Sequence, residues 1–138
     1  MAEAKLSIPK ARPLSPHLSI YRMSITMAMS IVHRITGGAL YLGTILLVWW
    51  LLSAASGPNA YAKVQWFMGS ILGRLILFGY TWALIHHMYG GIRHFIWDTG
   101  HGFEPGKREV LTWIGLIGSI VTTILLWVIG YAIMGDAR

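Results

Sequence analysis

The residues of this sequence that could do chemistry are ionisable side chains set within long apolar stretches. An ionisable side chain inside a bilayer is energetically costly, so it is a functional candidate by default. A neutral imidazole can bind a haem iron, and a guanidinium can bind carboxylates. The candidates all fall toward the same predicted side of the membrane, and they are His33, Arg34, His86, His87, Arg93 and His94.

His87 has the clearest surroundings. Gly91 and His94 follow it by four and seven residues, which places all three on one helical face. A face of small residues around one imidazole suits a flat macrocycle, which must approach the helix backbone when a histidine binds its iron. The pattern equally suits a helix-packing surface with a hydrogen-bonded histidine, and spacing alone leaves both interpretations open. The other small residues near this face are Gly79, Ala83 and Gly90.

His86 and His87 cannot both ligate one iron from the same helical face, because adjacent helical residues project ~100° apart. The small-residue face favours His87 as the ligand. His94 lies ~10 Å from His87 along the axis, so it could reach haem propionates rather than the iron. Arg93 and Arg34 could bind propionates with better hydrogen-bond geometry. A water-bonded imidazole at the membrane interface is the alternative for His94.

Four residues near the start of the first apolar stretch form a polar stripe. Ser30, His33, Arg34 and Gly37 follow an i, i+3, i+4, i+7 pattern, so they share one face of a helix. A hydroxyl, an imidazole and a guanidinium on one face suit a quinone headgroup, whose carbonyl oxygens need donors. The alternative is that Ser30 caps the helix while Arg34 extends to the interface.

Composition places these residues in a membrane protein. Hydrophobic residues make up 55% of the 138 residues and charged residues 12%, against ~25% charged residues in soluble domains. The chain has no cysteine, which excludes disulfides, iron–sulfur ligation and covalent haem attachment. The net charge of +6 comes from basic residues that flank apolar stretches, so it indicates membrane topology and not nucleic-acid binding.

The predicted fold is all-α, with three transmembrane helices. The spans are placed at about 30–54, 69–94 and 110–134, since ~20 apolar residues cross a bilayer. Residues 1–29 form a segment on the cytoplasmic or matrix side, and 30–138 form the transmembrane domain. A turn is expected at Ser56-Gly57-Pro58-Asn59.

Basic residues predict the orientation of the spans. Seven lie in the N-terminal segment and the second loop, against three on the other side, so the N-terminus is expected inside and the C-terminus outside. The first group is Lys5, Lys10, Arg12, Arg22, Arg93, Lys107 and Arg108, and the second is Lys63, Arg74 and Arg138.

Two motifs carry a resemblance to a known family. Arg12-Pro13 precedes Ser30-x-x-His33-Arg34-x-Thr36-Gly37 on the first span. The second span carries His87-x-x-x-Gly91-Ile92-Arg93-His94-x-x-x-Asp98. In this order the motifs resemble the cytochrome b large membrane-anchor subunit of succinate dehydrogenase, and with the third span the resemblance covers essentially the whole chain.

The resemblance implies a role in a four-subunit succinate:quinone oxidoreductase of a bacterial or mitochondrial inner membrane. The partners would be a flavoprotein, an iron–sulfur subunit and a second small anchor that supplies the other ligand of a shared haem b. Ubiquinone would be the substrate, and the chain alone would catalyse nothing. By resemblance, the iron ligand is His87, the quinone residues are Ser30 and Arg34, the propionate neighbours are His33, Arg34 and His94, and the inside-surface docking motif contains Arg93 and Asp98.

Four other classes of membrane protein are alternatives to a one-haem anchor of succinate dehydrogenase. An anchor of a quinol:fumarate reductase shares the machinery, and a haem-free anchor is the structural alternative. A two-haem anchor would need ligands near the outside half, where the sequence has no histidine. A channel or transporter subunit would be expected to show broken helices or internal repeats, and neither is evident.

Overall fold

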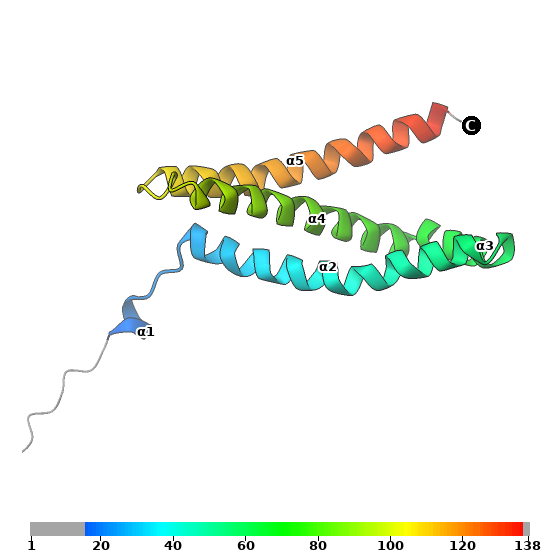
Figure 1. Ribbon diagram of the computed structural model, residues 1–138, viewed down its shortest axis with the longest axis horizontal. Coiled ribbons are helices and arrows are strands. Elements are labelled where there is room, and N and C mark those ends of the chain that lie inside the picture. The colour runs from blue at the N-terminus through cyan, green and yellow to red at the C-terminus, as the bar shows by residue number, and fades with distance from the viewer. Residues whose placement is uncertain (1–15, 137–138) are drawn as a thin grey trace, which may run out of the picture.

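A computed structural model describes residues 16–136, and within that range every regular element is a helix. Three long helices, α2, α4 and α5, run side by side, and α3 lies at the end where α2 and α4 are joined (Figure 1). The all-α prediction is confirmed. The Arg12-Pro13 motif and both chain ends lie outside the described residues. The helices are α1 (His17–Ile20), α2 (Ile25–Ala55), α3 (Pro58–Gly69), α4 (Ile71–Asp98) and α5 (Lys107–Asp136).

Helix α2 begins earlier than the span predicted from the sequence. Ser24 is its N-cap, with extended backbone and a side-chain oxygen that accepts a hydrogen bond from the Met27 backbone N–H at 3.3 Å. This satisfies one of the free N–H groups of the first turn. Ser30 therefore lies within the helix, and the interpretation of Ser30 as a capping residue is wrong.

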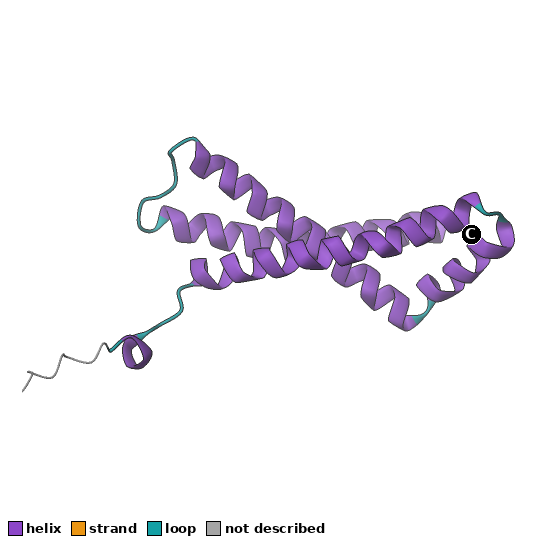
Figure 2. Cartoon of the chain, turned by 60° about the horizontal axis from the view of Figure 1, so that its bottom comes forward, coloured by secondary structure: helices purple, strands orange, loops and turns teal. Residues whose placement is uncertain are grey.

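The connection between the first two long helices contains a helix that the sequence analysis did not predict. Helix α3 begins at Pro58, where a missing N–H and a preset φ favour the first turn of a helix. It ends at Gly69. The next residue, Ser70, is the N-cap of α4, and its side-chain oxygen accepts a hydrogen bond from the Gly73 N–H at 3.1 Å. The axis turns by 80° at this break (Figure 2). The predicted second span, 69–94, thus starts in one helix and continues in another.

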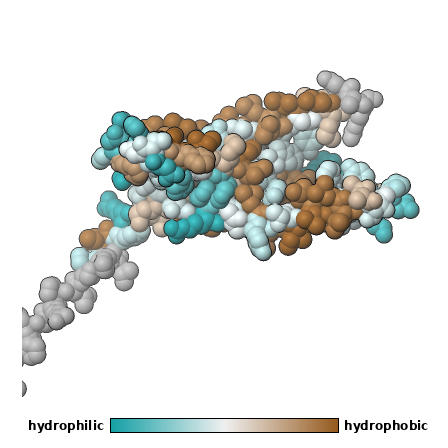
Figure 3. All heavy atoms as spheres, viewed as in Figure 1, coloured by the Kyte–Doolittle hydropathy of each residue, from teal (hydrophilic) through white to brown (hydrophobic). Residues whose placement is uncertain are grey.

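Two helices, α2 and α5, are each long and apolar enough to cross a membrane. Helix α4 meets that description only when it is taken together with α3. The physical reason is its content of polar residues, since Arg74, His86, His87, Arg93 and His94 all lie within it. Hydrophilic residues gather at the end of the molecule that carries the α4–α5 loop, whereas brown apolar surface covers much of α5 (Figure 3).

Helix α5 packs on α4 through small residues and cross-helix hydrogen bonds. Thr112, Ser119 and Thr123 are at most 1% exposed, and a Cβ added at Gly118 would lie 2.9 Å from the Tyr89 ring. Small side chains allow close approach of helices in a bilayer. The hydrogen-bonded pairs are Trp127 Nε1 with Thr81 Oγ1 (3.3 Å), His86 Nδ1 with Ser119 Oγ (3.1 Å), Tyr89 Oη with Thr122 Oγ1 (3.2 Å) and Arg93 Nη1 with Thr112 Oγ1 (3.4 Å).

Replacing Ser119 by Ala tests the contribution of one such pair. The Ser119 hydroxyl proton goes to the Leu116 carbonyl, so its oxygen accepts from His86 Nδ1. Ser119→Ala would leave that buried N–H without a partner and is expected to cost about 0.6–2 kcal/mol. Thr123→Val is the matched control, because the Thr123 hydroxyl bonds only the Ser119 carbonyl of its own helix.

The measurement is thermal unfolding of the purified, assembled protein in detergent. A lower midpoint is expected for Ser119→Ala than for Thr123→Val. Equal midpoints would show that the His86–Ser119 bond contributes nothing to the packing of α4 on α5.

Candidate functional site

The site lies where the first turns of α2 meet the last turns of α4. His33 of α2 inserts between two histidines of α4. Its ring stacks on His87 with centroids 4.0 Å apart and planes only 5° from parallel, and it lies 5.6 Å from the His94 ring at a tilt of 47°. The structure therefore brings together three of the residues singled out from the sequence.

The His87 ring is held through its Nδ1 atom. This nitrogen lies 3.2 Å from the His33 backbone carbonyl oxygen and 3.4 Å from Thr36 Oγ1. A carbonyl can only accept, so Nδ1 carries the proton and donates it. Thr36 also donates to the His33 carbonyl at 2.9 Å, and it is 2% exposed. The second nitrogen, Nε2, makes no hydrogen bond within the described part of the chain and keeps its lone pair.

Two glycines allow α2 and α4 to come this close. A Cβ at Gly90 would collide with the His33 ring, and a Cβ at Gly37 would lie 3.1 Å from Cε1 of His87. Each histidine thus faces a glycine of the opposite helix. From the sequence, Gly90 was expected only as a small residue near the His87 face and Gly37 as a member of the polar stripe and first motif, while Thr36 was part of that motif with no role of its own. The signal for Thr36 was its place three residues after His33, on the same face.

A groove between α2 and α4 continues from this cluster along the bundle. It has a volume of about 300 Å³ and is lined by small and apolar side chains. Ala83 and Gly79 line it about one and two turns before His87, and at Gly79 a Cβ would meet nothing within 4 Å. His87 is not among the residues that line this groove, so the fit to a haem rests on the His87 ring itself, whose Nδ1 is held by a carbonyl and whose Nε2 keeps a lone pair for iron. The remaining lining residues are Ala39, Leu42, Gly43, Leu46, Ile76 and Tyr80.

His86 and Arg93 point to the other side of α4, toward α5. The His86 side chain is 4% exposed and stacks on Trp82 at 5.1 Å. The Arg93 guanidinium lies 5.1 Å from the Trp97 ring centroid, and the residue is 7% exposed. The Arg93 side chain is thus enclosed between α4 and α5, and its place in an inside-surface docking motif stays a prediction.

The polar residues next to the histidine cluster are exposed. Ser30 and Arg34 lie one turn apart on α2, and neither side chain makes a hydrogen bond or ion pair within residues 16–136. His94 is exposed and meets the Trp97 ring edge-on at 5.3 Å. Asp98, the last residue of α4, is exposed. These side chains are free to bind groups that this chain does not supply.

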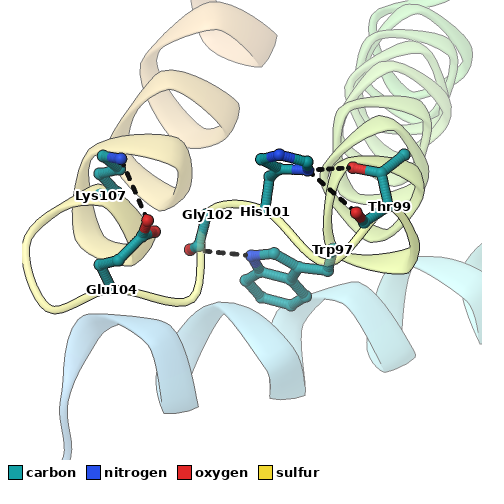
Figure 4. A network of polar contacts seen from close by, with 6 residues as sticks. All are labelled: Trp97, Thr99, His101, Gly102, Glu104 and Lys107. Carbon is teal, nitrogen blue, oxygen red and sulfur yellow. Dashed lines mark hydrogen bonds and ion pairs between the residues drawn. The ribbon is translucent and has the colours of Figure 1, made fainter.

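The loop between α4 and α5 forms an ordered surface beside Asp98 (Figure 4). Trp97 Nε1 donates to the Gly102 carbonyl at 3.3 Å, and His101 Nδ1 donates to the Thr99 carbonyl at 2.9 Å. Lys107 pairs with Glu104 at 3.1 Å. The backbone N–H of Glu104 and the Lys107 ammonium lower the pKa of the Glu104 carboxyl. The loop therefore holds a defined shape at the end of the bundle that carries the cluster.

Comparison with known proteins identifies the family. Residues 9–126 match the model of the succinate dehydrogenase/fumarate reductase transmembrane subunit. The chain belongs to this family.

Individual relatives agree with this assignment. The chain is 41% identical to the succinate dehydrogenase cytochrome b556 subunit of Paracoccus denitrificans over 118 residues, covering 86% of this chain and 91% of the relative. It is 38% identical to the cytochrome b556 subunit of Rickettsia felis over 128 residues, covering 93% and 100%. It is 41% identical to the mitochondrial cytochrome b560 subunit of Sus scrofa over 118 residues, covering 82% and 66%.

The resemblance found in the two sequence motifs is thus confirmed across the chain. The family is one of transmembrane subunits, and the apolar helices α2 and α5 agree with a multi-pass membrane protein. Its members named above are subunits of succinate dehydrogenase, which is an oxidoreductase. The histidine cluster lies inside the matched residues 9–126.

Proposed function

We propose that this chain is the haem b-binding membrane anchor of a succinate:quinone oxidoreductase, in which electrons from succinate reach ubiquinone. The observation that carries the proposal is the His87 imidazole, whose Nδ1 proton is held by the His33 carbonyl while Nε2 stays unbonded within the described residues. A metal-binding histidine nearly always has its other nitrogen fixed by such an acceptor. The chain by itself has no reaction to catalyse.

The axial role of His87 is supported by its surroundings as well as by its tautomer. The small residues Ala83 and Gly79, about one and two turns before it on α4, line a groove between α2 and α4. His86, the alternative ligand, already donates its Nδ1 proton to Ser119 in the α4–α5 interface. The second axial ligand would be a histidine of the other small anchor subunit. Bound haem b would supply a one-electron carrier.

Haem carboxylates would find cationic and hydrogen-bonding partners at the same end of the bundle. Arg34 and His94 are exposed, and His33 is half-buried between α2 and α4. An Arg–carboxylate pair is among the strong charge-assisted hydrogen bonds. We therefore assign the propionate neighbourhood to these three residues.

The quinone site is assigned to Ser30 and Arg34. Both side chains are exposed and make no hydrogen bond or ion pair within residues 16–136, and Ser24, not Ser30, caps the helix. Ubiquinone takes up two electrons from succinate, relayed by the iron–sulfur subunit, and two protons to become the quinol. A hydroxyl and a guanidinium aimed at its carbonyl oxygens favour the negative charge that reduction places there. Water and neighbouring imidazoles at the interface supply the protons.

The topology proposed for the assembly has three crossings, namely α2, the bent pair α3 and α4, and α5. The N-terminus would face the cytoplasm or matrix, where the flavoprotein and iron–sulfur subunits dock, and the C-terminus the opposite side. Asp98 and the ordered α4–α5 loop would then lie on the docking side. An anchor of a quinol:fumarate reductase would have the same topology, whereas a haem-free anchor would be distinguished by the lack of a b-type optical spectrum.

Single cysteines test the topology, because the natural chain has none. Ser56→Cys marks the α2–α3 turn and His101→Cys the α4–α5 loop, and both residues are exposed. A membrane-impermeant thiol reagent applied to sealed vesicles is expected to label the two variants from opposite sides of the membrane. Labelling of both from the same side would contradict three crossings.

Replacing His87 by Leu tests the haem ligand. The reduced-minus-oxidised spectrum of the purified complex is expected to lose or shift its b-type bands in His87→Leu. His101→Leu removes an exposed loop imidazole and should leave the bands in place. Should His87→Leu keep the normal spectrum and midpoint potential, the assignment is wrong and His86 becomes the candidate.

Ser30→Ala and Arg34→Leu test the quinone site. Loss of a hydrogen bond to a developing charge costs ~1.5–3 kcal/mol, so ubiquinone reduction should fall roughly 10- to 100-fold. Succinate oxidation by a soluble dye acceptor should persist in both variants. Ser56→Ala and Arg74→Leu make the same changes at the opposite end of the bundle and serve as controls. Normal ubiquinone reduction in the first pair, in an assembled complex, would place the site elsewhere.

A further inference from the structure

We propose that His33 is a positioning residue for the His87 imidazole. Its backbone carbonyl holds the Nδ1 proton of His87, and its ring, seated against Gly90, restricts the rotation of the His87 ring plane. The inference rests on the proposed function, because it takes His87 as the iron ligand. His33 would then act on the haem by orienting the His87 imidazole, in addition to any contact that it makes with a propionate.

The first part of the argument is the shared anchor point. The His33 carbonyl receives both the Nδ1 proton of His87 at 3.2 Å and the Thr36 hydroxyl at 2.9 Å. The backbone of α2 is rigid in this turn because it is helical on both sides of His33. The donor direction of the His87 ring is thus set by a helix and not by a mobile side chain. A ligand fixed in this way is more basic and favours the oxidised iron.

The second part is the confinement of the ring between two contacts. One face of His87 lies parallel to the His33 ring at 4.0 Å. The Cε1 edge of His87 points at Gly37, where a Cβ would lie only 3.1 Å away. Turning the His87 ring about its Cβ–Cγ bond would bring its edge toward the His33 ring. The orientation of the imidazole plane therefore depends on where His33 sits.

The third part of the argument is the gap on α4 that receives the His33 ring. His87, Gly90 and His94 are spaced i, i+3, i+7, so the two histidines stand above and below a gap at Gly90. The His33 ring fills that gap, and any Cβ at Gly90 would collide with it. Its Nδ1 atom is buried there and has no hydrogen-bond partner among the residues that the structure describes. A buried unpaired nitrogen is unfavourable, so the ring is held by its shape and stacking and not by its own hydrogen bond.

This arrangement predicts that haem properties respond to changes that touch no ligand atom. The angle between the planes of two axial imidazoles sets the magnetic anisotropy of a ferric low-spin haem, which electron paramagnetic resonance reports as the largest g value. The hydrogen bond at Nδ1 influences the midpoint potential. Both quantities are measured on the resting complex, without turnover.

The experiment uses four variants of the purified whole complex. Gly90→Ala would push on the His33 ring without altering a polar side chain, and Gly38→Ala is its control, because a Cβ there meets nothing within 4 Å. His33→Phe keeps a flat ring but no ring nitrogen, whereas His33→Leu keeps neither. We expect Gly90→Ala and His33→Leu to move the largest g value and the midpoint potential. Gly38→Ala should match the natural protein, and His33→Phe should retain the natural g value.

The outcomes separate this inference from the proposed function. Natural g value and potential in Gly90→Ala would overturn it, as would equal g shifts in His33→Phe and His33→Leu, which would show that the His33 nitrogens matter and not its ring. If Gly90→Ala fails to assemble, the two His33 variants decide the question alone. In either case His87→Leu reports independently on the haem ligand, so loss of its b-type bands leaves the proposed function standing.

Discussion

Within the hydrocarbon region no water is present to satisfy a polar group, so each one must find a partner in the protein. Helix α4 carries three of the six histidines of this chain, and two of them set how it packs against its neighbours. His87 finds the carbonyl of His33 on α2, and His86 finds the hydroxyl of Ser119 on α5. Neighbouring residues on one helix thus tie it to two different helices, because they project ~100° apart.

The two sides of α4 have different characters as a result. Toward α5 the contacts are a series of hydroxyl pairs and small residues, each bond of which is worth about 0.6 kcal/mol in a membrane. These contacts hold α5 against α4. Arg93 belongs to this side because its guanidinium lies over Trp97 and donates a hydrogen bond to Thr112. Toward α2 the rings stack, two glycines face two histidines, and both His87 Nε2 and His33 Nδ1 are left without a hydrogen bond within the described residues. That side is incomplete, and it is where the proposed chemistry lies.

The incompleteness agrees with membership of a family of transmembrane subunits. Ser30 and Arg34 are exposed at the end of an apolar helix, and a groove lined by small residues is open along α2 and α4. Under the proposed function, one imidazole would give a haem only one axial bond, and a second chain would have to supply the other. This chain would then hold one half of the site on helix backbone, and its partners would complete it.

The sequence by itself determined the class of protein, its all-helical fold and the identity of the polar candidates. Scarce charge, absent cysteine and two spaced motifs are properties that need no coordinates. Only the tertiary structure decided which neighbour each candidate meets. The sequence could not show that Ser24 caps α2, that α3 bends away from α4 by 80°, or that Arg93 is enclosed. Nor could it show that His33 lies against Gly90, because stacking across helices depends on how α2 and α4 are set side by side, and helical periodicity describes only one helix at a time.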